Sequence, residues 1–449
     1  MILYRTYLRP VIYKFSADVA GLCQRHLSER SRVLLVCVLT GMVCGVGAWV
    51  MKYLIRILSS SLTSRLTEGG FNWELLVCPL SGLVICGWMQ RRLFRRDVSR
   101  GTDRLRRALR AGHYALPHQL AYQPILGCAV TVGLGGSAGA EGPIAYAGAA
   151  MGSSTARFFR LAPGMTRIMV GFGAAAGISA IFKAPLAGVF FVLEVLGMQL
   201  TAVPLLGLVA CCLVGAFTAC LLSGMTPGLV WANAVTDFDY SALWWLLPVG
   251  VFMGLYCRWY NGSGLYMSRR WMSVVTPLMR ELGGGIFLGL LIFCMPALFG
   301  EGYVALQKML AGDLHSVLDY SPLSGVSGQW AIVLMLAGIL LVKGAAVYTT
   351  NYTGGVAGTF APTLFAGCMA GTLSAMGLGA LGCPLPPLTD SIRLHGRGYG
   401  GNSACAAHGY VYYRRGDHDL QSAVSCCHCG ISLLRRREFK LEEKFEVLK

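Results

Sequence analysis

The sequence predicts an all-α polytopic membrane protein, made of two related halves whose broken helices meet near the membrane midplane. The 449-residue chain is 55% hydrophobic and 13% charged, and its mean hydropathy is +0.57. Such a composition is typical of integral membrane proteins. Several of its apolar segments are too short to cross about 30 Å of hydrocarbon alone. The chain also has 58 glycines, and short glycine-interrupted segments in both halves are typical of inverted-repeat membrane folds.

The apolar segments define a membrane domain over residues 33–383, with halves at about 33–222 and 240–383. The first half is predicted to hold Val33–Ile57, Leu75–Trp88, Ile125–Leu134, Ile144–Phe158, Met169–Ile181, Ala184–Met198 and Val203–Leu222. The second half, which we expect to be incomplete, is predicted to hold Leu243–Tyr256, Gly284–Leu298, Trp330–Tyr348 and Val356–Leu381. Residues 1–32 are basic and show no cleavable signal, so we expect a cytoplasmic N-terminal segment.

The net charge of +17 at neutral pH could indicate nucleic-acid binding, but we attribute the basic residues to the cytoplasmic loops of a membrane protein. Nine arginines lie between Arg91 and Arg110, as expected of a cytoplasmic loop between membrane helices. No RNA- or DNA-binding motif accompanies them.

Residues 136–143, Gly-Ser-Ala-Gly-Ala-Glu-Gly-Pro, are the strongest candidate for a functional site. They place Glu141 inside an apolar region, where an ionisable side chain is costly and usually functional. Pro143 is expected at the first helical position, followed by a run that can form a helix. Because a helix start presents unpaired N–H groups and partial positive charge, the motif predicts an anion site with a glutamate at its mouth.

Three motifs resemble the CLC family of chloride channels and proton-coupled chloride exchangers, over about residues 30–383. Residues 139–143 resemble the family's Gly-Lys/Arg-Glu-Gly-Pro motif, with Ala140 in place of the basic residue. Residues 173–188 resemble its Ala-Ala-Ala-Gly…Ala-Pro-Leu-Ala-Gly segment, and residues 358–362 its Gly-x-Phe-x-Pro motif. One motif alone would be a weak signal, whereas three in this order and spacing are a strong one.

The resemblance implies a multi-pass protein of the cell membrane and a homodimer with one anion path per subunit. Its substrate would be chloride or a similar small anion, with no metal or organic cofactor. Glu141 would be the gating glutamate, which competes with the anion and leaves when protonated. Anion contacts would come from Ser99, Gly139, Ala140, Gly142, Thr359 and Phe360, and the helix starts would be marked by Pro143, Gly358 and Pro362.

Two positions depart from the family's pattern. Residues 98–103, Val-Ser-Arg-Gly-Thr-Asp, occupy the place of its Gly-Ser-Gly-x-Pro motif. Ser99 is therefore either an anion-facing hydroxyl or an N-cap or loop serine, and the sequence favours neither. Val195 stands where proton-coupled exchangers typically carry a second glutamate, which favours a channel or an uncoupled transporter.

Residues 384–449 are polar and contain no apolar run long enough to span a membrane. The family's second half should hold a counterpart of residues 183–194. Such a sequence, His-Ala-Pro-Leu-Thr-Gly-Met-Phe-Ile-Ile-Ala-Glu-Val, appears when Ala404–Asp417 are back-translated with suitably chosen codons and read in a shifted frame. We therefore interpret the tail as out of frame. The cluster Cys426-Cys427-His428-Cys429 does not have the spacing of a zinc site.

The sequence thus predicts a voltage-gated chloride channel-like protein with a glutamate gate. A chloride/proton antiporter and a fluoride-selective relative stay open, as does a nonfunctional truncated membrane protein. An intramembrane enzyme is disfavoured, because His113 and His118 share one loop without carboxylate partners.

Overall fold

The computed structural model describes residues 17–67, 72–198, 201–225, 246–310, 313–326 and 328–380, apart from residues 20, 24 and 27. Their regular structure is helical, interrupted by one isolated β-bridge between Gly139 and Gly358, so the predicted all-α class is confirmed. Six of the described helices are long and apolar enough to cross a membrane; their spanning stretches are Glu29–Thr63, Pro163–Phe182, Pro204–Leu222, Pro277–Cys294, Gln329–Tyr352 and Phe360–Ala380.

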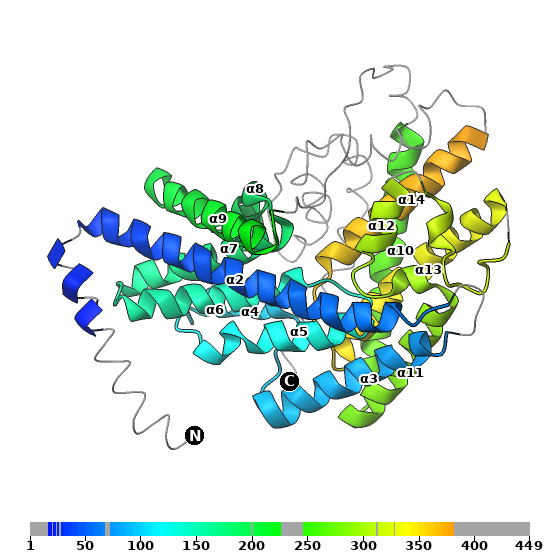
Figure 1. Ribbon diagram of the computed structural model, residues 1–449, viewed down its shortest axis with the longest axis horizontal. Helices are drawn as coiled ribbons and strands as arrows, with labels where there is room; N and C mark the ends of the chain where they lie inside the picture. The colour runs from blue at the N-terminus through cyan, green and yellow to red at the C-terminus, as the bar shows by residue number, and fades with distance from the viewer. Residues whose placement is uncertain are drawn as a thin grey trace.

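The helices of the first half share one hydrophobic core, and they gather on the left of Figure 1. Buried side chains of this core include Met51, Ile144 and Phe172, each at most 1% exposed. The helices are α2 (Glu29–Thr63), α4 (Gly101–Arg110), α5 (Gln123–Gly133), α6 (Glu141–Phe158), α7 (Pro163–Phe182), α8 (Pro185–Phe190) and α9 (Ala202–Leu222).

A second core lies among the later helices, on the right of Figure 1. They are α10 (Leu246–Met272), α11 (Pro277–Cys294), α12 (Tyr303–Leu310), α13 (Gln329–Tyr352) and α14 (Phe360–Ala380). Helix α3 (Glu74–Trp88) comes early in the chain but packs along α11, where the backbone of Leu76 lies against Gly289. The two halves are therefore tied together by α3.

The broken helices predicted from glycine and proline are present, although several bounds differ. The expected segment Ala184–Met198 is the short α8 followed by a π-helical turn, Phe191–Val195. Proline at the start of α8 and the left-handed backbone of Lys183 (φ 53°) separate it from α7. The expected segment Val356–Leu381 becomes helical only at Phe360, because the backbone N–H groups of Gly355, Val356 and Gly358 bond to Thr350, Thr131 and Gly139 instead. Residues 384–449 lie outside the described residues.

Candidate anion site

The two halves meet where two helix starts lie side by side. The backbone N–H of Gly139 donates to the carbonyl of Gly358 at 3.0 Å, and the N–H of Gly358 donates back to Gly139 at 2.6 Å. Helix α6 begins two residues after this bridge, at Glu141, and α14 begins two residues after it, at Phe360. Each half therefore contributes one helix start, and the two helix starts lie next to the same bridge.

The carboxylate of Glu141 binds the start of α14. Its Oε1 accepts hydrogen bonds from the backbone N–H of Phe360 at 2.5 Å and of Ala361 at 2.8 Å. Glu141 is buried, at 4% exposed. The next residue, Pro362, has no N–H, so the first two residues of the helix supply the donors that reach the carboxylate. The side chain thus stands where a helix start would hold an anion.

Two glycines leave room for this carboxylate. A Cβ on Gly358 would lie 2.6 Å from Oε1 of Glu141 and 2.7 Å from the nitrogen of Gly142. A Cβ on Gly139 would overlap the other carboxylate oxygen, Oε2. Any side chain at either position would therefore displace the glutamate or separate the paired loops.

One detail of the predicted site is wrong. Pro143 is the third residue of α6 rather than the first, because the helix already begins at Glu141, with Ala140 as its N-cap. The N–H groups that reach the carboxylate belong to Phe360 and Ala361, and Ala361 was not among the predicted residues. The anion contacts expected from Gly139, Ala140, Gly142, Thr359 and Phe360 stay predictions.

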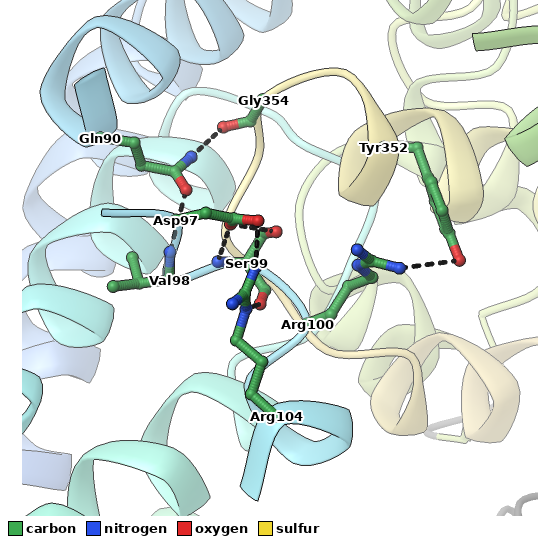
Figure 2. Close-up of polar contacts among 8 residues, drawn as sticks. All are labelled: Gln90, Asp97, Val98, Ser99, Arg100, Arg104, Tyr352 and Gly354. Atoms are coloured by element: carbon green, nitrogen blue, oxygen red, sulfur yellow. Dashed lines mark hydrogen bonds and ion pairs between the residues drawn. The ribbon is translucent and has the colours of Figure 1, made fainter. Parts of the chain in front are cut away.

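The hydroxyl of Ser99 is directed at Asp97 (Figure 2). It donates to Oδ1 of Asp97 at 2.5 Å, and the Ser99 backbone N–H donates to the same atom at 2.8 Å. The N-cap interpretation is wrong, because α4 begins at Gly101 and has Arg100 at its N-cap. The structure therefore shows a loop serine whose hydroxyl proton is already used.

Gln90, which the sequence analysis missed, joins two loops of the site (Figure 2). Its Oε1 accepts from the backbone N–H of Val98 at 3.1 Å, and its Nε2 donates to the carbonyl of Gly354 at 2.8 Å. Only a side-chain amide offers an acceptor and a donor in this geometry. The signal available in the sequence was a polar residue just after the apolar segment Leu75–Trp88. In the structure, this residue lies in the π-helical turn Met89–Phe94.

Lys343 of α13 was missed as well. It is fully buried, and its Nζ donates to the hydroxyl of Ser137 at 2.9 Å and lies 4.6 Å from the ring centroid of Phe365. An ionisable side chain inside a membrane protein is costly and usually functional. Here it lies against the loop that leads to Glu141.

Replacing Gln90 with leucine should destabilise the protein, since the buried Val98 N–H and the half-buried Gly354 C=O would lose their partner. A buried polar group left without a partner costs about 1–3 kcal/mol. Gln90→Glu keeps the acceptor for Val98 but places a carboxylate in a buried site against the carbonyl of Gly354, so it should destabilise the protein as well. The thermal midpoint of detergent-solubilised protein measures both. Equal midpoints for wild type and Gln90→Leu would show that the amide does not hold the loops.

One known protein family matches most of this chain. Residues 82–393 match the family described as voltage gated chloride channel. The chain belongs to this family. Members of the family are channels and transporters of chloride and related small anions rather than enzymes. The predicted resemblance and the multi-pass membrane location are confirmed.

Individual relatives agree with this assignment. A putative chloride channel protein ClcB-like from Ralstonia nicotianae is 28% identical over 334 residues, or 73% of each chain. A voltage-gated ClC-type chloride channel ClcB from Salmonella dublin is 26% identical, covering 76% of this chain and 79% of the relative.

Solved structures of two antiporters share the fold. A CLC-type fluoride/proton antiporter superposes with a TM-score of 0.64 at 19% identity, covering 81% of this chain and 85% of the other. A slow cyanobacterial Cl⁻/H⁺ antiporter superposes with a TM-score of 0.62 at 16% identity, covering 94% and 99%. These matches confirm the family's fold for this chain.

Proposed function

We propose that this family member passes chloride or a similar small anion in the manner of a channel, with Glu141 as its gate. The observation that carries the proposal is the carboxylate of Glu141 on the N–H groups of Phe360 and Ala361. The carboxylate is itself an anion, and it occupies the N–H donors that would otherwise bind a permeating anion. Permeation requires binding that is favourable but weak, and backbone N–H groups without a bound cation suit that requirement.

Gating then follows from competition for the same two donors. The ionised carboxylate holds the N–H groups and closes the path. Protonation removes its charge and weakens both hydrogen bonds, since bonds to ionised acceptors are about twice as strong as neutral ones. A chloride ion then takes the donors. We propose a homodimer with one such path in each subunit and no cofactor.

Val195 should leave the path without proton coupling. It is buried and carries no titratable group, and its carbonyl accepts a hydrogen bond from Nε of Arg106 at 2.9 Å. Simultaneous recording of chloride and pH on reconstituted full-length protein should show chloride flux without uphill proton movement. Uphill proton movement at a fixed ratio to chloride would contradict the channel-like proposal. Val195→Glu is the matched variant, because it restores a titratable group at this position.

An antiporter is the second candidate, because both solved relatives described above are antiporters. One exchanges fluoride for protons and the other exchanges chloride for protons. The recording above separates channel from exchanger, and repeating it with a fluoride electrode separates the two anions.

A nonfunctional membrane protein is the candidate from another class. It rests on the polar composition of residues 384–449, which replaces the apolar segments expected of the second half. The coding nucleotide sequence from Ala370 to the stop codon tests it. A frame disruption near residues 384–400 would support it, and a continuous frame would make the tail a genuine segment.

A further inference from the structure

Three helix ends meet at one edge of the molecule. Helix α3 runs antiparallel to α11, because its first turn lies against Gly289 and its last turn, at Gly87, lies against Glu281 (Figure 1). The end of α3 is therefore beside the start of α11. Helix α10 ends at the same place, since a ring carbon of Trp271 lies 3.1 Å from the position of a Cβ on Gly283. We call this edge, residues 88–97 and 269–281, the basic edge.

The basic edge carries seven arginines and two carboxylates. Both carboxylates are already paired. Glu281 is buried and binds Arg91 with both oxygens, one of them at 2.9 Å, and Asp97 pairs with Arg104. Five further arginines are exposed and form no ion pair within the part of the chain that the structure describes; they are Arg92, Arg95, Arg96, Arg269 and Arg270. Their charge is available to an anionic partner.

Large apolar side chains are exposed among these arginines. Trp88 is 54% exposed and Leu93 is 60% exposed, and Leu278 and Met279 are exposed at the start of α11. Tryptophan at the end of an apolar helix is typical of the membrane–water interface, where its ring lies among the headgroups. Arginine at the same depth packs its apolar stem and keeps its guanidinium in the polar layer. The basic edge thus offers apolar contacts and cationic donors to one amphipathic ligand.

We infer that the basic edge binds an anionic phospholipid, with the headgroup phosphate on the exposed arginines and the acyl chains along the exposed apolar side chains. Guanidinium groups bind phosphate through paired N–H donors. Clusters of arginine directly beside membrane helices attract anionic lipids. A soluble phosphate would use the same donors, but it would make no use of Trp88 and Leu93. The inference does not depend on the proposed anion path.

A lipid bound here would also support the loops of the candidate anion site. The π-helical turn Met89–Phe94 belongs to the basic edge, and its Gln90 joins Val98 to Gly354. A ligand that binds the folded protein and not the unfolded chain stabilises the folded protein. Anionic lipid should therefore raise the thermal midpoint.

Native mass spectrometry of the detergent-solubilised full chain, titrated with phosphatidylglycerol or phosphatidylcholine, tests the inference. Wild type should bind phosphatidylglycerol at least about tenfold more tightly, and only this lipid should raise the thermal midpoint. Arg95→Gln/Arg96→Gln and Arg269→Gln/Arg270→Gln should each weaken its binding roughly tenfold. Arg95→Lys/Arg96→Lys should keep much of the affinity, because the charge stays.

Arg56→Gln/Arg65→Gln is the matched control. It removes two exposed arginines near the end of α2, next to the turn in which Thr67 and Asn72 lead into α3, and so at the far end of α3 from the basic edge. Its affinity for phosphatidylglycerol should equal that of wild type. Equal affinity of wild type for the two lipids, or an equal loss in this control, would overturn the inference.

Inorganic phosphate at the same concentration is the third arm of the titration. If it raises the thermal midpoint as much as phosphatidylglycerol does, the ligand is a soluble anion and the lipid assignment fails. If the glutamine variants do not fold, wild type in increasing sodium gluconate decides, because binding through arginine should weaken as salt screens the charges. Preference for phosphatidylglycerol that is independent of salt would contradict the inference.

Discussion

Replacing Glu141 with glutamine should open the anion path at every pH. In wild type the ionised carboxylate holds two backbone donors, and bonds of this kind contribute about 1.5–3 kcal/mol each. Glutamine is neutral and competes poorly for those donors, so chloride flux at neutral pH should rise at least about tenfold. Flux into liposomes, measured from acidic to alkaline pH, should increase with acidity in wild type and stay constant in the variant.

Glu74→Gln is the control for this variant, because it removes a carboxylate from the first turn of α3, away from the paired loops. A wild-type pH dependence that persists in Glu141→Gln would contradict the gate assignment. If neither protein shows flux, calorimetry gives the same answer without transport, because Glu141→Gln should bind one more chloride per chain than wild type.

Replacing Gly173 with alanine should strongly destabilise the protein. Helices α6 and α7 approach so closely that a Cβ on Gly173 would overlap the carbonyl oxygen of Gly148, and a Cβ on Gly148 would overlap that of Gly173. Overpacking of this kind costs about 1–3 kcal/mol. For a chain of this length, the thermal midpoint in detergent should fall by roughly 1–3 °C. Chloride flux should also change, because α6 begins with Glu141.

Gly164→Ala is the matched control in the same helix. Nothing lies within 4 Å of a Cβ built at Gly164, so its thermal midpoint should equal that of wild type. A Gly173→Ala protein as stable as Gly164→Ala would show that α6 and α7 do not depend on backbone contact here.

The fold class and the place of Glu141 at a helix start were predictable because they depend on local sequence. Hydropathy identifies the long helices, and glycine with proline marks where α8 and α14 begin. An isolated glutamate in an apolar run identified Glu141 without any tertiary information. The exact helix start was not predictable, since Pro143 and Pro362 fit either a first or a third helical position.

The contacts that complete the site were not predictable, because they join residues far apart in the chain. Ala361 is 220 positions from Glu141, and Gly354 is 264 positions from Gln90. Arg100 was interpreted as one of nine arginines in a loop, and only its contact with Tyr352 distinguishes it. The packing of α3 against α11 is likewise a tertiary fact.

The central claim is that Glu141 occupies the place of a permeating anion, and anomalous diffraction from bromide-soaked crystals tests it most directly. In Glu141→Gln the account predicts a bromide peak within hydrogen-bond distance of the backbone nitrogens of Phe360 and Ala361. Wild type at alkaline pH should show the Glu141 carboxylate there and no bromide. A variant without bromide at these nitrogens, or a wild type with bromide there beside an ionised Glu141, would contradict the account.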